Sequence, residues 1–470
     1  MRPNHRYSLI LCLLLTFQVS RSADLFSSDS IRKYGDLTDD YIRLIKHADY
    51  KSNSNVGGTV RPSSIWTRAV FYEGHMAWYA VRPDTALYNY AYNWASYFKW
   101  EMSKQLNTGT NADFQCIAQT YIDLYNLAPD PNKIKVAKSC MLYNINTNKS
   151  TYWTWIDAIQ MAMPIYAGLG KITGDTTYYH YMWDSYMYTR NKLGVIGTWN
   201  PKDSLWWRDD KYNRTVVDPY GKPIYWSRGN GWVYAALVRV LSIIPKTEAH
   251  YKQYLDDYLA MSGAIVRWQR EDGFWNPSLV SPSYYGGKET TGTGLFVYGM
   301  AWGINQGLLS RSKYLSAVKK GWIALSRDAI HPNGFLGWVQ GTGASPADSQ
   351  PFGYDVVPNF EDYGAGCVLL GAAESWKLSR TIEKEDSISH VKALPSESNE
   401  KDVLKCGNKL IISVKERTNI RIYRLNGSII RSFMLEGFQE FETDMTEWQP
   451  GMYLVQLQNS KQGRNVKIIR

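Results

Sequence analysis

The sequence contains few cysteines and no long apolar run. Five cysteines occur among 470 residues, and none forms a C-x-x-C pair or belongs to a Cys/His cluster. Zinc-binding proteins usually show such spacing, so we expect neither a metal site nor a cofactor. A bridge between Cys116 and Cys140 is left open. No stretch approaches the roughly 20 apolar residues of a membrane-spanning helix, so no membrane span is expected.

Basic residues outnumber acidic ones, but they do not cluster. The chain carries 53 Lys and Arg against 43 Asp and Glu, a net charge of +10 that is spread along its length. Nucleic-acid-binding proteins usually concentrate their basic residues, so we expect no nucleic acid partner. An acidic small or polymeric ligand remains compatible with this charge. The 19 Trp and 35 Tyr residues suit stacking on flat ligand faces as well as core packing.

The N-terminus has the pattern of an export signal. Basic residues within Met1–Arg6 precede a short apolar run, Leu9–Val19, and small residues follow it. This arrangement predicts a secretory signal over residues 1–22. We therefore expect an exported protein, located in the periplasm, at the cell surface or in the medium.

A repeat of about 45 residues organises residues 23–380. Turn signals recur at this spacing, each after an apolar helical run and before an amphipathic one: Arg82-Pro83-Asp84, Ala128-Pro129-Asp130 and Thr173-Gly174-Asp175. Helices that are apolar on all sides are typical of an interior, whereas helices with one polar face are typical of a surface. Six such pairs predict an all-α (α/α)6 barrel, an inner ring of parallel helices within an outer ring. The predicted inner helices are Ala69–Val81, Cys116–Leu127, Asp157–Ile172, Gly231–Ile244, Gly294–Leu309 and Gly364–Leu378.

The loops before the inner helices are rich in polar and aromatic residues. Because parallel inner helices begin at one end of the barrel, these loops are expected to surround one pocket. Asp, Thr and Asn at helix starts also act as simple caps, which is the competing interpretation. The leading loops contain Trp66-Thr67-Arg68, Asn111-Ala112-Asp113, Trp153–Asp157, Trp226–Trp232, Glu289–Thr293 and Glu361-Asp362-Tyr363.

The composition changes after the last apolar helix. Residues 381–402 are charged and weakly periodic, which is typical of a linker. Residues 403–470 contain short alternating runs with turns at Asn426-Gly427 and Pro450-Gly451, a pattern that predicts a small all-β sandwich. This strand pattern and the closing basic strand resemble the C-terminal sorting domain of the bacterial type IX secretion pathway. The resemblance implies secretion machinery as a possible partner.

Two carboxylates are the candidates for acid–base chemistry. Asp157 begins an inner helix behind Trp153 and Trp155. A helix N-terminus favours the carboxylate, whereas burial against indole rings raises the pKa and favours the acid, and the sequence does not decide between them. Asp113 begins the preceding inner helix. The two acids are expected to face a sugar as a pair, one transferring protons and one orienting hydroxyls or water, unless both are helix caps.

Arginine and tryptophan residues supply the candidates for substrate binding. Arg228 and Trp232 lie four residues apart and share a helix face, where they offer a fork for a carboxylate and a stacking plane for a sugar ring. Gly229 and Gly231 allow a close backbone approach to a ligand. The polar, aromatic stretch Trp206–Asp210 is interpreted as pocket rim. The substrate-binding candidates are Arg228, Trp232, Trp207, Arg208, Trp66, Thr291 and Thr293.

Four motifs give residues 31–378 a resemblance to glycoside hydrolase family 105, the unsaturated rhamnogalacturonyl hydrolases, which are related to family 88. The resemblance implies an (α/α)6 barrel. It also implies an acidic oligosaccharide substrate that ends in a 4,5-unsaturated uronic acid, the product of a polysaccharide lyase. The motifs are Asn111–Cys116, Trp155–Pro164, Trp226–Val233 and Gly286–Gly294.

The family mechanism assigns roles to the matching residues. A carboxyl group protonates the double bond at C4 while water adds at C5, and the resulting hemiketal opens and expels the neighbouring sugar. By resemblance, Asp157 is the proton donor and Asp113 holds ring hydroxyls, while Arg228 and Trp232 bind substrate. Some family members carry a pocket histidine where this chain has Trp206-Trp207-Arg208. That departure favours an ulvan-type or other rhamnose–uronate substrate, with the arginine serving a carboxylate or sulfate.

Three other functions are kept open. A polysaccharide lyase on the same toroid needs a base and a neutralising cation, for which Tyr72, His75 and Arg228 are candidates, although a buried, hydrogen-bonded His75 is favoured. A carbohydrate-binding protein without activity is the second alternative. An ordinary inverting glycosidase on saturated sugars is the third.

Overall fold

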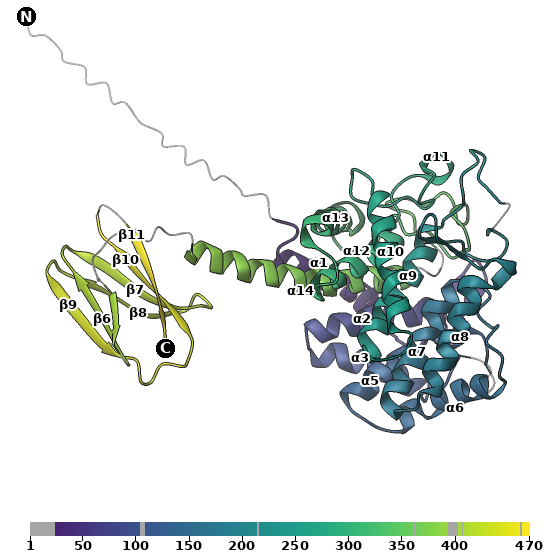
Figure 1. Cartoon of the computed structure of the whole chain (residues 1–470), viewed down its shortest axis with the longest axis horizontal. Helices are drawn as coiled ribbons and strands as arrows, with labels where there is room; N and C mark the ends of the chain where they lie inside the picture. The colour runs from purple at the N-terminus through teal and green to yellow at the C-terminus, as the bar shows by residue number, and fades with distance from the viewer. Residues whose placement is uncertain are drawn as a thin grey trace, which may run out of the picture. The chain divides into compact units, whose positions relative to one another are not determined.

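The computed structural model divides into two compact units, Met1–Arg380 and Thr381–Arg470 (Figure 1). The predicted signal and residues 393–402 lie outside the residues that the structure describes. The described residues are 24–103, 109–213, 216–358, 360, 362–392, 403–406, 408–460 and 463–470.

The first unit is the predicted (α/α)6 barrel. Its inner helices begin up to four residues before the predicted starts, because polar residues of the leading loops form the first helical turns. Outer helices alternate with the inner ones along the chain, and α1 supplies the sixth. The inner helices are α2 (Trp66–Val81), α4 with α5 (Ala112–Gln115 and Ala118–Leu127), α7 (Asp157–Thr173), α9 (Ser227–Ile243), α12 (Thr290–Asn305) and α14 (Asp362–Lys392). The outer helices are α1 (Ser28–Asp40), α3 (Thr85–Tyr97), α6 (Asn132–Asn146), α8 (Thr177–Asn191), α10 (Tyr251–Arg267) and α13 (Arg311–Ala324).

Burial follows the hydrophobic periodicity that predicted the two rings. Every residue of α12 from Thr290 to Ile304 is buried, as expected for an inner helix. The outer helix α13 buries only one face, which includes Tyr314, Val318 and Trp322. None of the described helices is long and apolar enough to cross a membrane.

Close contact between backbones closes the inner ring. A Cβ atom placed on Gly74 of α2 would lie 2.3 Å from the carbonyl oxygen of Gly366 in α14. One placed on Gly294 of α12 would lie 2.8 Å from the carbonyl oxygen of Cys367. The first and last inner helices therefore touch, and α14 lies between α12 and α2.

The chain ends of the barrel unit also meet. The Ser379 hydroxyl of α14 donates a hydrogen bond to the carbonyl of Phe26 at 2.7 Å, and Trp322 Nε1 of α13 donates to Leu25 at 3.1 Å. These bonds fix the segment before α1 against both α13 and α14. Helix α1 thereby occupies the outer position that completes the sixth pair.

The second unit is the predicted β sandwich. Its two antiparallel sheets have the strand orders β5-β6-β9 and β11-β10-β7-β8, and they enclose a core that includes Ile412, Ile422 and Val455. Gly427 takes φ 83° in the turn predicted before β8. Residues 381–392, interpreted from the sequence as part of a linker, continue helix α14. The strands are β5 (Val403–Cys406), β6 (Lys409–Val414), β7 (Thr418–Arg424), β8 (Ile429–Leu435), β9 (Gln439–Asp444), β10 (Met452–Gln458) and β11 (Gly463–Ile469).

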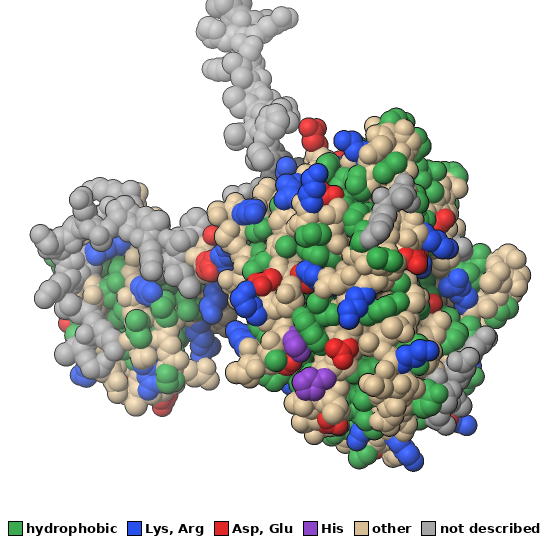
Figure 2. Space-filling view, turned by 45° about the vertical axis from the view of Figure 1, so that its right-hand side comes forward, with side chains coloured by type: hydrophobic (Ala, Val, Ile, Leu, Met, Phe, Trp, Pro, Cys, Tyr) green, Lys and Arg blue, Asp and Glu red, His purple; other side chains and the backbone are tan. Residues whose placement is uncertain are grey.

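Charged side chains are interspersed on the surface. On the face drawn in Figure 2, Lys and Arg side chains are scattered over the surface, and Asp and Glu side chains lie at separate points among them. This distribution matches the spread of charge along the sequence.

Gly74→Ala is expected to weaken the barrel. The added methyl group would press on the Gly366 backbone and cost about 1–3 kcal/mol of unfolding free energy. The matched control is Gly263→Ala in α10, where no heavy atom lies within 4 Å and the better helix former should stabilise by up to about 1 kcal/mol. Thermal denaturation measures both variants. An unchanged midpoint for Gly74→Ala would show that the two helices are not in contact there.

Candidate active site

Asp157 is the first residue of α7 and is largely buried. The carboxyl residue is 8% exposed, and its Oδ2 atom lies 3.4 Å from Nε of Arg208. The backbone N–H of Ile156 donates to the carbonyl of Arg208 at 3.0 Å, which holds the two segments together. Burial raises the pKa of Asp157, and the charges of Arg208 and Arg228 oppose this effect without cancelling it. Of the two opposing effects expected from the sequence, burial is therefore the larger, and Asp157 keeps its proton to a higher pH than an exposed aspartate does.

Asp113 lies in the first turn of α4, beside Asp157 and Arg208. The Asn111 side chain caps this helix by accepting from the Asp113 N–H at 2.8 Å, so the Asp113 carboxyl is not needed as the cap. Burial and the negative charge of Asp157 raise the pKa of Asp113 to about 6, while Arg208 and Arg61 act in the opposite direction. The structure thus brings together the two carboxyls predicted to form a pair.

Arg208 links the pair to the polar stretch that was predicted as a rim. Its Nη1 atom donates to Asp209 at 2.6 Å, while Nε faces Asp157. The hairpin of β3 (Trp199–Asn200) and β4 (Leu205–Trp206) leads into this segment. Trp207 is partly buried, and its ring centroid lies 5.8 Å from that of Tyr225.

The Arg228 guanidinium anchors a loop, and its terminal N–H groups are not free to bind a carboxylate of the substrate. Its side chain is fully buried, and its terminal nitrogens donate to the carbonyls of Gln340 at 2.6 Å and Gly341 at 2.7 Å. The guanidinium also lies over the Tyr363 ring, 5.0 Å from its centroid. Arg228 acts on the acid through its charge, which lowers the pKa of Asp157.

The two predicted stacking tryptophans lie at different depths. Trp232 has no exposed surface, and its ring lies edge-on to Trp66 with a centroid separation of 6.3 Å. Trp66 is partly exposed and lies 5.1 Å from Tyr363. Trp66 is therefore the ring available to a ligand, and Trp232 supports it from the interior.

Thr291 and Thr293 serve helix α12. Both are fully buried, and their hydroxyls donate to Oε1 and to the carbonyl of Glu289, each at 2.6 Å. The Glu289 carboxylate caps the helix by accepting from the N–H groups of Thr291 and Gly292. Helix capping, the alternative interpretation of these leading residues, explains both threonines.

The glycines around Arg228 allow helices to pack and do not admit a ligand. A Cβ atom on Gly229 would lie 2.8 Å from the Trp226 ring, and one on Gly231 would lie 2.8 Å from Leu295. Asn230, between them, was given no role from the sequence. Its side chain accepts from the Trp206 N–H at 2.8 Å and donates to the Trp206 carbonyl at 3.0 Å, so it fixes strand β4 to α9.

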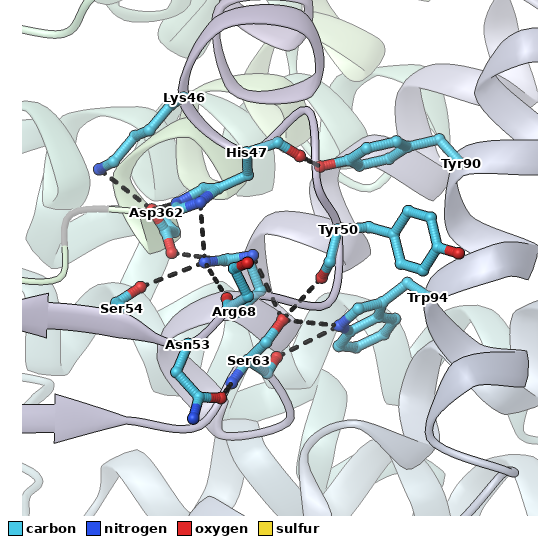
Figure 3. Close-up of polar contacts among 11 residues, drawn as sticks. Lys46, His47, Tyr50, Asn53, Ser54, Ser63, Arg68, Tyr90, Trp94 and Asp362 are labelled. Atoms are coloured by element: carbon cyan, nitrogen blue, oxygen red, sulfur yellow. Dashed lines mark hydrogen bonds and ion pairs between the residues drawn. The ribbon is translucent and has the colours of Figure 1, made fainter.

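A buried ionic cluster at the start of α2 and α14 was also missed (Figure 3). Arg68 Nε donates to Asp362 Oδ2 at 2.6 Å, and the Nε2 atom of His47 lies 2.8 Å from Asp362 Oδ1. Lys46 Nζ lies 3.1 Å from the same carboxylate. Burial alone would raise the pKa of Asp362, but the three basic groups hold it well below its usual range. The sequence placed Arg68 and Asp362 in leading loops without showing that they meet.

The other titratable candidates have structural partners. His75 is fully buried, with Nδ1 2.5 Å from Asp39 Oδ1 and Nε2 2.8 Å from the Leu87 carbonyl, as favoured from the sequence. Cys116 and Cys140 are free and buried, so the bridge left open is not formed. Within the described ranges, no three His, Cys, Asp or Glu residues are grouped so as to hold a metal ion.

Asp113→Asn is expected to stabilise the folded chain in alkaline solution. Its pKa rises from 3.8 to about 6 on folding, so the folded chain binds this proton more tightly than the unfolded chain. That contribution is present below the unfolded value and is lost as the pH rises through about 6. The substitution should therefore add up to about 2 kcal/mol near pH 8 and little near pH 4. Denaturant titrations at both pH values, with exposed Asp184→Asn as control, test this, and an equal effect at both values would refute it.

Comparison with known proteins identifies the barrel. Residues 42–379 match glycosyl hydrolase family 88, and residues 406–470 match a secretion system C-terminal sorting domain. A relative from Formosa agariphila, named unsaturated 3S-rhamnoglycuronyl hydrolase, is 32% identical over 339 residues, covering 67% of this chain and 84% of the relative. A family 88 structure from Bacteroides vulgatus has a TM-score of 0.67 at 29% identity, covering 75% of this chain and 99% of that one. A structure named as a polysaccharide lyase has a TM-score of 0.66 at 27% identity, covering 79% and 99%.

The resemblance to family 105 is not confirmed by these matches, whereas the related family 88 is. The C-terminal resemblance to a sorting domain is confirmed, and it indicates an exported or cell-surface protein. Since the first match spans most of the barrel unit, the chain belongs to glycosyl hydrolase family 88 and is a glycosidase.

Proposed function

We propose that this chain removes a 4,5-unsaturated uronic acid from the non-reducing end of oligosaccharides released by polysaccharide lyases. The observation that carries the proposal is the pair of carboxyls with raised pKa values, Asp157 and Asp113, on neighbouring inner helices. Protonation of a carbon–carbon double bond requires an acid that retains its proton near neutral pH. Burial raises the pKa of Asp157 and so shifts this residue toward that property.

The two acids take different parts in the reaction. Asp157 transfers its proton to C4 of the sugar, and water adds its oxygen at C5. The proton that water releases restores Asp157, and the hemiketal opens to expel the neighbouring sugar. Asp113 accepts hydrogen bonds from ring hydroxyls, and above about pH 6 it does so as a carboxylate. Arg208 stabilises the negative charge that remains on Asp157 after proton transfer.

The neighbouring sugar is proposed to be rhamnose that carries a sulfate group. The Formosa agariphila relative is named as a hydrolase of an unsaturated 3S-rhamnoglycuronyl group. The present chain has Arg208 in the segment where some family 105 members carry a histidine, and an arginine suits a sulfate better. The four motifs described above further favour the family 105 branch of these enzymes.

A polysaccharide lyase is the second candidate, because one of the similar structures bears that name. The residues suggested as its base are not available, however. Tyr72 is fully buried and stacks on Trp94 with centroids 3.8 Å apart, and both ring nitrogens of His75 are hydrogen bonded. A lyase creates the ultraviolet absorbance of the unsaturated uronate, whereas the proposed hydrolase removes it.

The sorting domain suggests a role outside the barrel. We infer that secretion machinery recognises residues 406–470, and that the N-terminal signal directs the first step of export. Neither step involves the residues of the candidate site.

Asp157→Asn is expected to abolish most of the turnover and to leave binding nearly unchanged. The amide has the shape of the acid but cannot donate the proton, so turnover should fall by roughly 10²- to 10⁴-fold. The assay follows the loss of ultraviolet absorbance from lyase-treated ulvan and pectin. Asp184→Asn, at an exposed position on α8, is the control. Near-normal turnover in Asp157→Asn would remove this residue from the mechanism.

A further inference from the structure

A short hairpin connects the buried ionic cluster to the site. Its strands are β1 (Ser54–Val56) and β2 (Thr59–Arg61), which pair in antiparallel register immediately before α2. Most of the hairpin is exposed, but Ser54 and Arg61, which form one register pair, are partly buried. The function described above uses no residue of this hairpin.

The base of the hairpin is fixed from both sides (Figure 3). Arg68 Nη2 donates to the Ser54 hydroxyl at 3.1 Å at its beginning. At its end, the Ser63 hydroxyl donates a hydrogen bond to the Tyr50 carbonyl at 2.9 Å. The same hydroxyl accepts a hydrogen bond from Trp94 Nε1 at 3.2 Å. Because Arg68 is itself bonded to Asp362, the ionic cluster holds the base of the hairpin in place.

Arg61 is restrained at the end of this hairpin. Its backbone pairs with that of Ser54, which Arg68 anchors. Its guanidinium lies over the Phe360 ring, 4.6 Å from the centroid, and Phe360 is buried just before α14. A cation stacked on an aromatic ring retains its hydrogen-bond donors for another partner.

The hydrogen-bond donors of the Arg61 guanidinium are available to a ligand. Within the described part of the chain, Arg61 makes no hydrogen bond or ion pair, whereas Arg68, Arg208 and Arg228 are all bonded to protein oxygens. Its positive charge nevertheless acts on the carboxyl of Asp113. A partly buried guanidinium whose donors lack protein acceptors can bind an oxyanion of a ligand.

We propose that Arg61 binds an oxyanion of the substrate on the Asp113 side of the site. The inference rests on the proposed function, since the substrate must be acidic. Two sources share this chemistry: the carboxylate of the unsaturated uronate and a sulfate on the adjacent sugar. Arginine binds either through paired N–H donors. The hairpin and the ionic cluster at its base are the positioning elements, and Arg61 is a residue that determines specificity.

Binding measurements on the full chain test the proposal without depending on turnover. In the Asp157→Asn background, Arg61→Ala is titrated calorimetrically with the unsaturated uronyl–rhamnose disaccharide, with and without its sulfate. Loss of a charge-assisted contact should weaken binding by about 10- to 100-fold. A loss confined to the sulfated disaccharide identifies sulfate, and an equal loss with both identifies the carboxylate. Arg61→Lys should bind more tightly than Arg61→Ala but less tightly than the parent, because lysine keeps the positive charge and lacks the paired N–H donors of the guanidinium.

The control is Arg32→Ala, which removes an exposed arginine from the outer helix α1 and should leave both affinities unchanged. Added salt should weaken disaccharide binding by the parent more than binding by Arg61→Ala, since the contact made by Arg61 is ionic. Affinities of Arg61→Ala within twofold of the parent would overturn the role of Arg61 and leave the proposed function intact. If the parent binds neither disaccharide, the proposed function itself fails, and the assignment of Arg61 fails with it.

Discussion

The junction between the first and the last inner helix is the contact on which the site depends. The Arg68–Asp362 ion pair, at 2.6 Å, joins residues 294 positions apart at the N-terminal ends of α2 and α14. One turn or more deeper, Gly74 and Gly366 bring the two backbones into contact. Since all inner helices begin at this end, closing the ring gathers their first turns into one region. The carboxyls, the arginines and Trp66 then share a single environment.

Within that environment, desolvation sets the chemistry. A carboxyl at a helix N-terminus normally ionises more easily, because the helix dipole favours its negative charge. At Asp157 the loss of water raises the pKa by more than the nearby arginines lower it, so this carboxyl keeps its proton to a higher pH than an exposed aspartate does. Burial also raises the pKa of Asp113, and the negative charge of neighbouring Asp157 raises it further. An arginine that binds protein carbonyls, such as Arg228, contributes a fixed charge without competing for the ligand.

The sequence predicted the architecture well because the two rings leave a periodic signal. Helices apolar on all sides, such as α12, and helices apolar on one side, such as α13, differ in the spacing of their apolar residues, and this difference is visible in the sequence. Asp113 and Asp157 were found because both stand at the start of apolar runs. The roles of Arg228 and Thr291 were less accessible, since their partners, Gln340 and Glu289, accept hydrogen bonds in ways that no spacing encodes. Arg61 gave no signal, because an isolated arginine before a helix is commonplace.

The bonds between the ends of the barrel unit have a consequence for biogenesis. Ser379 reaches back to Phe26, so the sixth helical pair combines the beginning of the folded unit with its end. A chain emerging from the ribosome or from a translocation channel N-terminus first cannot complete this pair until α14 has followed. Such long-range contacts slow folding, and the ring cannot close before α14 is available. Loss of either terminal segment would leave an incomplete ring, with an inner helix exposed to water.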